Sequence, residues 1–574
     1  MSTASAQGLQ ASEWWRSAAI YQIYPRSFAD SNGDGMGDLP GIRARLAQLE
    51  NLYLDAIWLS PFYASPQRDA GYDVSDYCSV DPLFGTLDDF DALLAEAHRL
   101  GLRVLIDLVP NHTSSDHEWF KAAVAAGPGS EERTHFLFRD GRGPNGDEPP
   151  NNWQSVFGGS AWERLTAPDG SPEQWYLHLF DVSQPDLDWT SEWVREQFRE
   201  ILRFWLRRGV DGFRVDVAHG LVKKAGLPDY TPPPADDTAS MTAPGDVPYW
   251  GQPGVHEIYR DWHAIVTSFG VDRILCAEAW VDPLSKLADW VRPDEMQQAF
   301  NFRFLGAAWS APDIRSAIVD SLEAFEAVGA VATWVLSNHD VIRHASRLGL
   351  NPPPPQGTGI GPKTIPKPDA VLGLRRARAE TLMMLALPGG AYLYQGEELG
   401  LPEDTEIPDS ARQDPSFFRN PAKGHYGRDG CRVPIPWEAD APAYGFSPSG
   451  ASWLPQPKQW ARFARDRQPA PQEPHEFAGN THTLSLYSRA LELRRLGQLG
   501  LGKLTWLDGF GDDVIAFRCA SVREITVISN LGTSPIRLPA GEPLIFSERP
   551  WLDEPMRELA PDTTIWMTES TPTG

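Results

Sequence analysis

The chain has 574 residues and a formal net charge of −26, with 41% hydrophobic and 22% charged residues. This length exceeds one typical domain, so we expect a large core with one or two smaller domains attached. The composition is that of a folded globular protein. The negative charge argues against nucleic acid and anionic membranes as partners, because both repel an acidic surface.

The termini and the cysteines predict a cytoplasmic protein. Residues 1–13 contain neither a basic segment nor an apolar one, so no secretory signal is expected. No stretch of about 20 apolar residues predicts a transmembrane helix. The four cysteines form no CxxC pair, which fits a reducing compartment, and Cys276 lies in an apolar run that predicts burial.

Short apolar runs typical of strands recur along the chain and alternate with segments of helical periodicity. The helical segments include 87–100, 191–208 and 483–499. This alternation predicts a parallel sheet, either open or closed, and eight units favour a (β/α)8 TIM barrel. The eight expected strands are 20–24, 56–59, 104–108, 212–217, 274–277, 299–302, 332–336 and 391–394.

Polar side chains of reactive type follow several of these runs. Charged groups are costly in a core strand unless they are paired or functional. In TIM barrels the active site is built at the carboxyl ends of the strands. We therefore expect a site formed by Asp107, Asn111 and His112 after the third run, Arg214, Asp216 and His219 after the fourth, Glu278 after the fifth, and Asn338, His339 and Asp340 after the seventh.

Two insertions and a change of pattern suggest the domain boundaries. Residues 113–184 are too many for a simple loop after the third strand and predict a small lid (B) domain. The barrel is then expected to cover 1–112 and 185–502, with a Pro- and Asp-rich exposed loop at 231–254. From 503 to 574 short alternating runs predict a C-terminal all-β, sandwich-like domain.

Four segments resemble the sequence regions that characterise the α-amylase family, glycoside hydrolase family 13, and they occur in the family's order. They are Asp-Leu-Val-Pro-Asn-His at 107–112, Gly-Phe-Arg-Val-Asp at 212–216, Ala-Glu-Ala-Trp at 277–280 and Ser-Asn-His-Asp at 337–340. Further segments at 71–77, 184–188, 394–398 and 427–432 are similar to the oligo-1,6-glucosidase and α-glucosidase subfamily. The signature Gln-Pro-Asp-Leu-Asn of that subfamily ends here in Asp188. The resemblance extends from about residue 14 to residue 499.

The resemblance implies a retaining glycosidase with three carboxyl groups. Asp216 would be the nucleophile, Glu278 the general acid/base, and Asp340 the group that binds hydroxyls of the distorted sugar. Arg214, two residues before Asp216 and so on the same face of its strand, is expected to keep Asp216 ionised and aligned.

The same resemblance implies a closed pocket for one terminal glucose. Asp69 and Arg432 would hold the far hydroxyls of this sugar, with Arg428 as the alternative to Arg432. The charged hydrogen bonds of such a pocket would reject a longer chain. The other expected substrate contacts are Tyr72 as the aromatic platform, His112 and His339 as hydrogen-bond donors, and Phe157 and Phe180 as lid aromatics, for which simple core packing is the alternative.

The loop 30–38 carries oxygen-bearing residues at alternate positions, as calcium loops do. It begins like an EF-hand, but its twelfth position is Gly41 and not Glu. Its resemblance to the calcium loop of this glucosidase group implies a structural Ca2+, with Mg2+ or a metal-free turn as alternatives, and no organic cofactor. The implied ligands are Asp30, Asn32, Asp34, Met36 through its carbonyl, and Asp38.

These features predict an exo-acting α-glucosidase of short maltose- or isomaltose-type glucosides, as a monomer or homodimer. A transglucosidase or a relative acting on sucrose or trehalose would share the same catalytic residues. A non-catalytic amylase-like protein is the alternative from another class. Val217, directly after the expected nucleophile, favours α-1,6 linkages, whereas the following Ala-His-Gly resembles enzymes that act on maltose.

Overall fold

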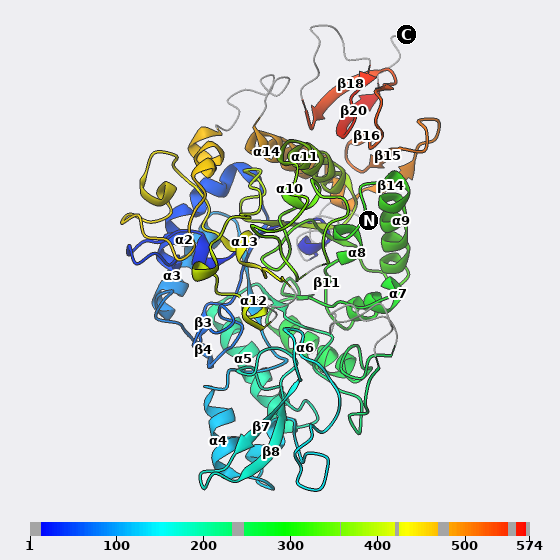
Figure 1. Cartoon of the computed structure of the whole chain (residues 1–574). Helices are drawn as coiled ribbons and strands as arrows, with labels where there is room; N and C mark the ends of the chain where they lie inside the picture. Colours follow the sequence, from blue (N-terminus) through cyan, green and yellow to red (C-terminus); the bar gives the residue numbers. More distant parts are fainter. Residues whose placement is uncertain are drawn as a thin grey trace.

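A computed structural model describes residues 13–231, 246–355, 357–419, 424–468, 482–548 and 558–569. Eight parallel strands form one sheet at the centre of the molecule (Figure 1), in the order β11-β10-β9-β5-β2-β1-β13-β12. Phe300, after β11, forms a parallel bridge to Thr333 in β12, which brings the two edges of the sheet together in a nearly closed barrel. The strands are β1 Ala19–Ile23, β2 Ala56–Leu59, β5 Arg103–Leu108, β9 Gly212–Val215, β10 Ile274–Ala277, β11 Gln298–Ala299, β12 Thr333–Val335 and β13 Gly390–Tyr394. The predicted TIM barrel is confirmed.

Each barrel strand is followed by helical chain, as a parallel barrel requires. The helix α3 begins with a capping box, in which Thr86 and Asp89 exchange hydrogen bonds, and α5 ends at Gly209 with φ of 103°. Both boundaries therefore lie where local sequence signals favour them. The helices of the barrel and its loops are α2 Leu39–Arg45, α3 Leu87–Arg99, α5 Glu192–Arg208, α6 Val255–Phe269, α7 Leu284–Leu287, α8 Phe302–Leu305, α9 Ala311–Glu326, α10 His344–Arg347, α11 Ala370–Ala386, α12 Pro415–Arg419, α13 Asp429–Arg432 and α14 Thr483–Gly497.

The barrel interior has a core of its own. Its apolar members include Trp58, Leu105, Cys276, Phe300 and Tyr392, one or more from each of several strands. Parallel barrels bury both faces of their strands, which explains why the strands consist of continuous apolar runs. At one level of this interior the register pairs Arg214 with Asp107 and with Cys276. An arginine is thus held inside the barrel, next to the strand ends.

The chain between β5 and α5 forms a small separate sheet at the lower end of Figure 1. Its antiparallel order is β6-β8-β7, with β6 Phe138–Arg139, β7 Trp162–Thr166 and β8 Pro172–Leu177, and it is preceded by α4 Glu118–Ala126. Two isolated antiparallel bridges join the beginning of this inserted segment to its end. They pair His112 with Asp186 and Phe136 with Leu187. A two-stranded sheet, β3 Tyr63–Ala64 with β4 Asp76–Val80, lies in the loop after β2.

The C-terminal region is all-β, as expected. Its five antiparallel strands have the order β14-β15-β16-β20-β18, and β17 pairs with β19 beside them. One face packs against α11, where the Trp566 indole donates to the Leu382 carbonyl and the Thr564 hydroxyl donates to the Ala379 carbonyl. The bounds are β14 Lys503–Trp506, β15 Val514–Ala520, β16 Glu524–Asn530, β17 Ile536–Arg537, β18 Gly541–Phe546, β19 Glu558–Leu559 and β20 Thr563–Glu569.

Some predicted boundaries are wrong in detail. The sixth strand ends at Ala299, and Phe302 begins the helical turn α8, because the Asn301 side chain accepts a hydrogen bond from the Phe304 amide and caps that turn. The fourth strand ends at Val215, so Asp216 and Val217 lie beyond it. The predicted loop 231–254 falls largely on residues 232–245, which lie outside the described residues.

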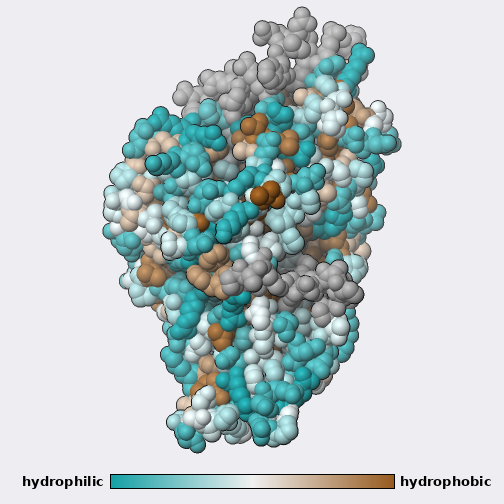
Figure 2. Space-filling view, in the orientation of Figure 1, coloured by the Kyte–Doolittle hydropathy of each residue, from teal (hydrophilic) through white to brown (hydrophobic). Residues whose placement is uncertain are grey.

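The four cysteines are free, and Cys276 is buried as predicted. On the face shown in Figure 2 hydrophobic residues occur in small scattered groups among hydrophilic ones, which is usual for a protein surface. Among the described helices, none is both long and apolar enough to cross a membrane.

Candidate active site

One arginine inside the barrel connects three carboxyl groups that come from three neighbouring strands. The Arg214 Nη1 donates to Asp107 Oδ1 at 2.8 Å and to Asp216 Oδ1 at 2.6 Å. Its Nη2 lies 3.0 Å from Glu278 Oε2. Arg214 is only 2% exposed, and the guanidinium packs 5.1 Å from the Trp58 ring. The structure thus brings the predicted nucleophile and the predicted acid/base to the same cation.

The charges of this cluster favour a bound proton. Burial raises the pKa of Asp216 well above its ordinary value, Arg214 opposes the rise, and the like charges of Glu278 and Asp107 add to it. Burial also raises the pKa of Asp107, to about 7, against the effect of Arg214. The expectation that Arg214 keeps Asp216 ionised therefore describes only one contribution, since one guanidinium faces three carboxyl groups. Retaining chemistry needs one protonated and one ionised carboxyl group, which such a cluster can provide.

The backbone after β9 is unusual. Val217 has a φ of 45°, which is strained for a β-branched residue. In this conformation its amide donates to Glu278 Oε2 at 2.9 Å, while the Ala218 amide donates to the Glu278 carbonyl at 2.8 Å. These two hydrogen bonds connect the turn that carries Asp216 to Glu278, the residue directly after β10. Val217 itself is buried among lid aromatics.

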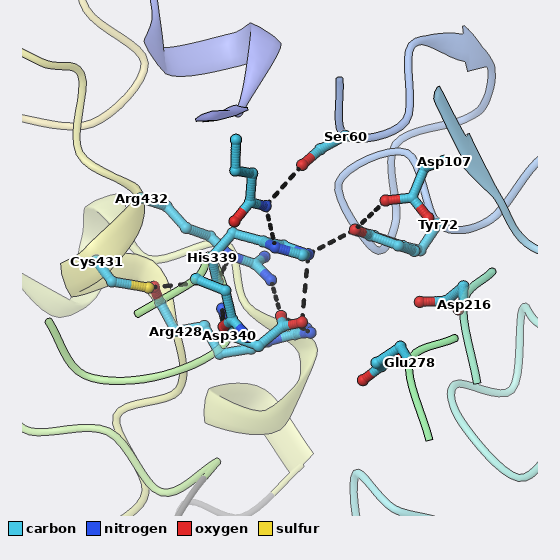
Figure 3. Close-up of polar contacts among 12 residues, drawn as sticks. Ser60, Tyr72, Asp107, Asp216, Glu278, His339, Asp340, Arg428, Cys431 and Arg432 are labelled. Carbon is cyan, nitrogen blue, oxygen red and sulfur yellow. Dashed lines mark hydrogen bonds and ion pairs between the residues drawn. The ribbon is translucent and has the colours of Figure 1, made fainter. Parts of the chain in front are cut away.

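Across the site, Tyr72 and His339 form a stacked pair. Their rings are nearly parallel, with centroids 5.3 Å apart, and the Tyr72 hydroxyl lies 2.5 Å from His339 Nε2 and 3.1 Å from Asp107 Oδ2. His339 Nε2 also lies 3.2 Å from Asp340 Oδ2. Burial keeps the pKa of His339 far below its ordinary value, so the ring is neutral. Figure 3 shows this chain of contacts facing the side chains of Asp216 and Glu278.

Asp340 is the most accessible of the three predicted catalytic carboxyl groups. Its side chain is 27% exposed, whereas those of Asp216 and Glu278 are 8% and 7% exposed. Burial alone would raise the pKa of Asp340, but the guanidinium groups of Arg428 and Arg432 lower it. Asp340 is therefore a partly exposed anion, suited to accept hydrogen bonds from sugar hydroxyls.

Asp69 is paired with Arg428. Arg428 Nη2 donates to Asp69 Oδ1 at 2.8 Å, and its Nη1 donates to Asp340 Oδ1 at 3.0 Å. Arg432 donates to Asp340 Oδ1 and to the His339 carbonyl, both at 2.8 Å, and no contact between Arg432 and Asp69 is found among the described side chains. Of the two arginines, Arg428 is the one that contacts Asp69, while both contact Asp340. Burial raises the pKa of Asp69 to about 6, against the effect of Arg428.

His112 is linked to Asp69 through the side chain of Gln184. Its Nε2 is 3.2 Å from the Gln184 amide nitrogen, and that amide also donates to Asp69 Oδ2 at 3.0 Å. The His112 ring packs 5.2 Å from Phe180. Burial lowers the pKa of His112 to about 4, so the imidazole is neutral at physiological pH.

The two predicted lid aromatics lie together. The rings of Phe157 and Phe180 meet edge to face with centroids 5.7 Å apart, and the Arg428 guanidinium lies 5.2 Å from the Phe157 ring. Both side chains are 6% exposed and belong to a cluster that also includes Val217 and Trp250. They therefore pack in a core, which reaches the site through the contact of Phe157 with Arg428.

A buried lysine joins the inserted segment to the barrel. Lys223 Nζ lies 2.8 Å from Asp186 Oδ2 and 2.8 Å from Asn111 Oδ1, and it also donates to the Gly220 carbonyl. Burial lowers the pKa of Lys223, opposed by Asp186. Asp186 lies at the end of the inserted segment, and Asn111 lies just after β5. Lys223 thus links the inserted segment to the barrel.

The expected metal loop, residues 30–38, is a compact turn between β1 and α2. The Asp30 oxygens accept from the Gly33 and Gly35 amides at 2.7 and 2.8 Å, and Asp38 Oδ1 accepts from the Gly41 amide at 2.6 Å. Within the described part of the chain no group of three or more His, Cys, Asp or Glu side chains is placed to hold a metal. The expected set also includes Asn32 and a backbone carbonyl, which are oxygen ligands outside those residue types.

Some contacts of the site could not be read from the sequence. Asp107 was expected at the site and Gln184 belongs to a recognised motif, but their contacts to Arg214 and Asp69 follow only from the fold. Asp414 accepts from the Arg428 Nε and main-chain amide, and it carries no sequence signal that could have revealed this role. His219, predicted at the site by its position, is fully buried and packs 4.6 Å from the Trp250 ring.

Comparisons with known proteins agree with this geometry. A family model described as the α-amylase catalytic domain matches residues 22–497. A probable α-glucosidase of Rhizobium meliloti (strain 1021) is 39% identical over 458 residues, which cover 77% of this chain and 77% of that protein. An oligo-1,6-glucosidase of Parageobacillus thermoglucosidasius is 35% identical over 473 residues, covering 77% and 78%. The crystal structure of the α-glucosyl transfer enzyme XgtA has a TM-score of 0.79 and 35% identity, covering 96% of this chain and 99% of that one.

Proposed function

The chain belongs to the α-amylase family and is a glycoside hydrolase, and from this premise we propose that it is a retaining, exo-acting α-glucosidase. Its substrates would be short α-glucosides of the maltose and isomaltose class, and its product glucose from their non-reducing end. The observation that carries the proposal is the shared guanidinium: Asp216 and Glu278 contact Nη1 and Nη2 of the same Arg214.

The shared contact supports retention because it places the two carboxyl groups close together. Retaining glycosidases hold them about 5–5.5 Å apart, whereas inverting enzymes leave roughly 6.5–9.5 Å for a water molecule. Two oxygens bound at 2.6 and 3.0 Å to adjacent nitrogens of one planar group fit the shorter separation.

In the first step, the Asp216 carboxylate attacks the anomeric carbon while Glu278 gives its proton to the glycosidic oxygen. The bond between the anomeric carbon and that oxygen breaks, and the aglycone leaves as an alcohol. In the second step, Glu278 takes a proton from water, whose oxygen attacks the anomeric carbon and releases Asp216 and glucose. Positive charge develops on the sugar ring in both steps, and the anionic cluster around Arg214 stabilises it.

The exo-acting part of the proposal is supported by the opposite end of the pocket. Asp69, Arg428 and Asp340 form a charged, hydrogen-bonded wall there, and Phe157 packs on Arg428. A wall of this kind suits the terminal hydroxyls of one glucose and would reject a longer chain. The name of the oligo-1,6-glucosidase relative and the buried Val217 next to Asp216 both favour α-1,6 linkages.

Retention predicts the anomer that is released first. When maltose or isomaltose is hydrolysed, proton NMR recorded in the first minutes should show α-glucose, which then mutarotates to the equilibrium mixture. Initial release of β-glucose would contradict the proposed roles of Asp216 and Glu278. The ratio of kcat/KM for maltose, isomaltose, sucrose and trehalose would define the linkage.

Transfer of glucose to a sugar is the second candidate function, favoured by the likeness to the α-glucosyl transfer enzyme XgtA. The same glycosyl-enzyme would be intercepted by a sugar hydroxyl in place of water. Product analysis at high maltose separates the two activities, since hydrolysis gives mainly glucose and transfer gives mainly oligosaccharides.

For the loop 30–38 we propose a structural Ca2+. Each carboxylate has about four lone-pair sites, so the hydrogen bonds that Asp30 and Asp38 accept leave oxygen capacity for a cation. Asn32, Asp34 and the Met36 carbonyl would complete the oxygen set, as in other calcium loops. The ion would hold the loop after β1 and would take no part in catalysis.

The calcium proposal predicts a change in thermal stability. Removing divalent ions with EDTA should lower Tm by several degrees, because an ion that binds only the folded state stabilises it. Adding Ca2+ should restore Tm, and Mg2+ should show whether the loop discriminates between the two ions. The variant Asp34→Ala is the control, since its Tm should no longer respond to EDTA. Elemental analysis without any bound ion, together with an unchanged Tm, would refute the site.

A further inference from the structure

The two oxygens of the Glu278 carboxyl group have different surroundings. Oε2 accepts from the Val217 amide at 2.9 Å and lies 3.0 Å from the Arg214 guanidinium. Oε1 accepts one neutral hydrogen bond, from the Trp280 indole nitrogen at 2.9 Å. A proton on Oε2 would compete with a cation and an amide, so the proton of the acid form belongs on Oε1.

The Trp280 indole is itself held in place by a stacked ring. Its ring system lies parallel to the Phe302 ring, with centroids 3.8 Å apart and an angle of 7° between the planes. Phe302 begins the turn α8, which Asn301 caps by accepting from the Phe304 amide, and the Asn301 amide in turn donates to Ser321 at 2.7 Å. Phe302 is 8% exposed, while Trp280 above it is partly exposed.

We propose that Trp280 is a positioning residue that holds Oε1 of Glu278, the oxygen that delivers the proton, toward the leaving glycosidic oxygen. The inference rests on the proposed function and adds to it a residue that never bonds to the sugar. Without the indole N–H the Glu278 carboxyl group would be fixed at Oε2 only and could rotate about its last side-chain bond. Proton delivery depends on alignment, so this freedom slows the step that needs the proton.

The consequence depends on the leaving group. Maltose releases an alcohol, which must receive a proton as the bond breaks. 4-Nitrophenyl α-glucoside releases a stabilised phenolate, which leaves without such help. A defect in proton delivery therefore lowers kcat/KM for maltose and spares the aryl glucoside, whereas a general distortion of the pocket lowers both.

The test compares Trp280→Phe with the wild-type enzyme on these two substrates. Phe keeps an aromatic ring against Phe302 and removes the N–H. We expect kcat/KM for maltose to fall on the order of 10-fold or more, since general acid catalysis contributes about 10²–10⁴-fold in all. For the aryl glucoside we expect a change of less than about 3-fold, because proton delivery contributes little there.

Two further variants control for structural effects. Phe302→Leu keeps the indole N–H but removes the ring that holds it, and it should show the same selectivity in a weaker form. Trp290→Phe removes another buried indole, which donates to the Ala218 carbonyl at 3.3 Å, and it should leave the ratio of the two substrates unchanged.

The kinetic results distinguish failure of the Trp280 proposal from failure of the proposed α-glucosidase function. Wild-type turnover of both glucosides tests that function, and its absence would overturn both proposals. If the wild type is active, equal losses on the two substrates in Trp280→Phe, or no loss on maltose, would overturn the role of Trp280. If Trp280→Phe does not fold, the ratio measured with Phe302→Leu decides in the same way.

Discussion

Replacing Asp216 with Asn should lower kcat for maltose on the order of 10⁴-fold or more, as expected when the group that forms a covalent intermediate is lost. An amide cannot attack the anomeric carbon, although it can still accept the hydrogen bond that Arg214 donates to Asp216 Oδ1. The fold should therefore survive, and the loss should appear in kcat for maltose and for 4-nitrophenyl α-glucoside alike. Steady-state kinetics on both substrates checks the prediction.

Azide distinguishes the nucleophile from the acid/base. In Asp216→Gly, azide can occupy the space of the lost carboxylate and attack the substrate once, giving β-glucosyl azide. In Glu278→Ala, the glycosyl-enzyme still forms from the aryl glucoside, and azide then gives α-glucosyl azide. The opposite assignment of the two products would exchange the roles of Asp216 and Glu278.

Asp211 provides a matched control for the nucleophile. It is a buried carboxylate directly before β9, 4% exposed, and it pairs with Arg273 and with His98. Asp211→Asn should lower Tm because its ion pairs are weakened, while kcat stays within about 2-fold because this end of the strand is remote from the site. If Asp216→Asn behaved like this control, Asp216 would be a structural residue.

Replacing Arg428 with Met should have the second largest effect, because Arg428 is bound to three carboxylates, Asp69, Asp340 and Asp414. Removing one partner of buried ion pairs costs about 3–5 kcal/mol, so the free energy of unfolding should fall in that range. The kcat/KM for maltose should fall on the order of 10³-fold, since the wall that holds the terminal hydroxyls is lost. Denaturant unfolding and steady-state kinetics measure the two effects.

A double-mutant cycle tests whether Arg428 or Arg432 is the partner of Asp69. The effects of Asp69→Asn and Arg428→Met should be strongly non-additive, because their side chains are in direct contact at 2.8 Å. Asp69→Asn and Arg432→Met should be closer to additive, since Arg432 contacts Asp340 and the His339 carbonyl instead. Stronger coupling through Arg432 would contradict the geometry.

The amino-acid sequence by itself predicts the barrel and the candidates for the reacting groups. The eight apolar runs predict the eight strands because a parallel barrel buries both faces of every strand. Each strand therefore appears in the sequence as a short continuous run of apolar residues. Arg214, Asp216, Glu278 and Asp340 stand out as site candidates for a similar reason, while the separate role of each rests on the resemblance to the α-amylase family. Charged groups at the ends of core strands are too costly to occur there without a role.

Only the tertiary structure decides how these groups are paired. Arg428 and Arg432 lie one helical turn apart in the same motif, so spacing alone could not say which of them reaches Asp69. Asp414 and Lys223 carry no motif, and their roles depend on contacts to partners distant in sequence, such as Asp186 and Asn111 for Lys223. The pKa of Asp216 is likewise set by burial and by Arg214, Glu278 and Asp107 together. The physical reason is that electrostatic energies depend on the distances between charges and on their burial in the folded chain. Residue types and their order in the sequence do not specify these distances or this burial.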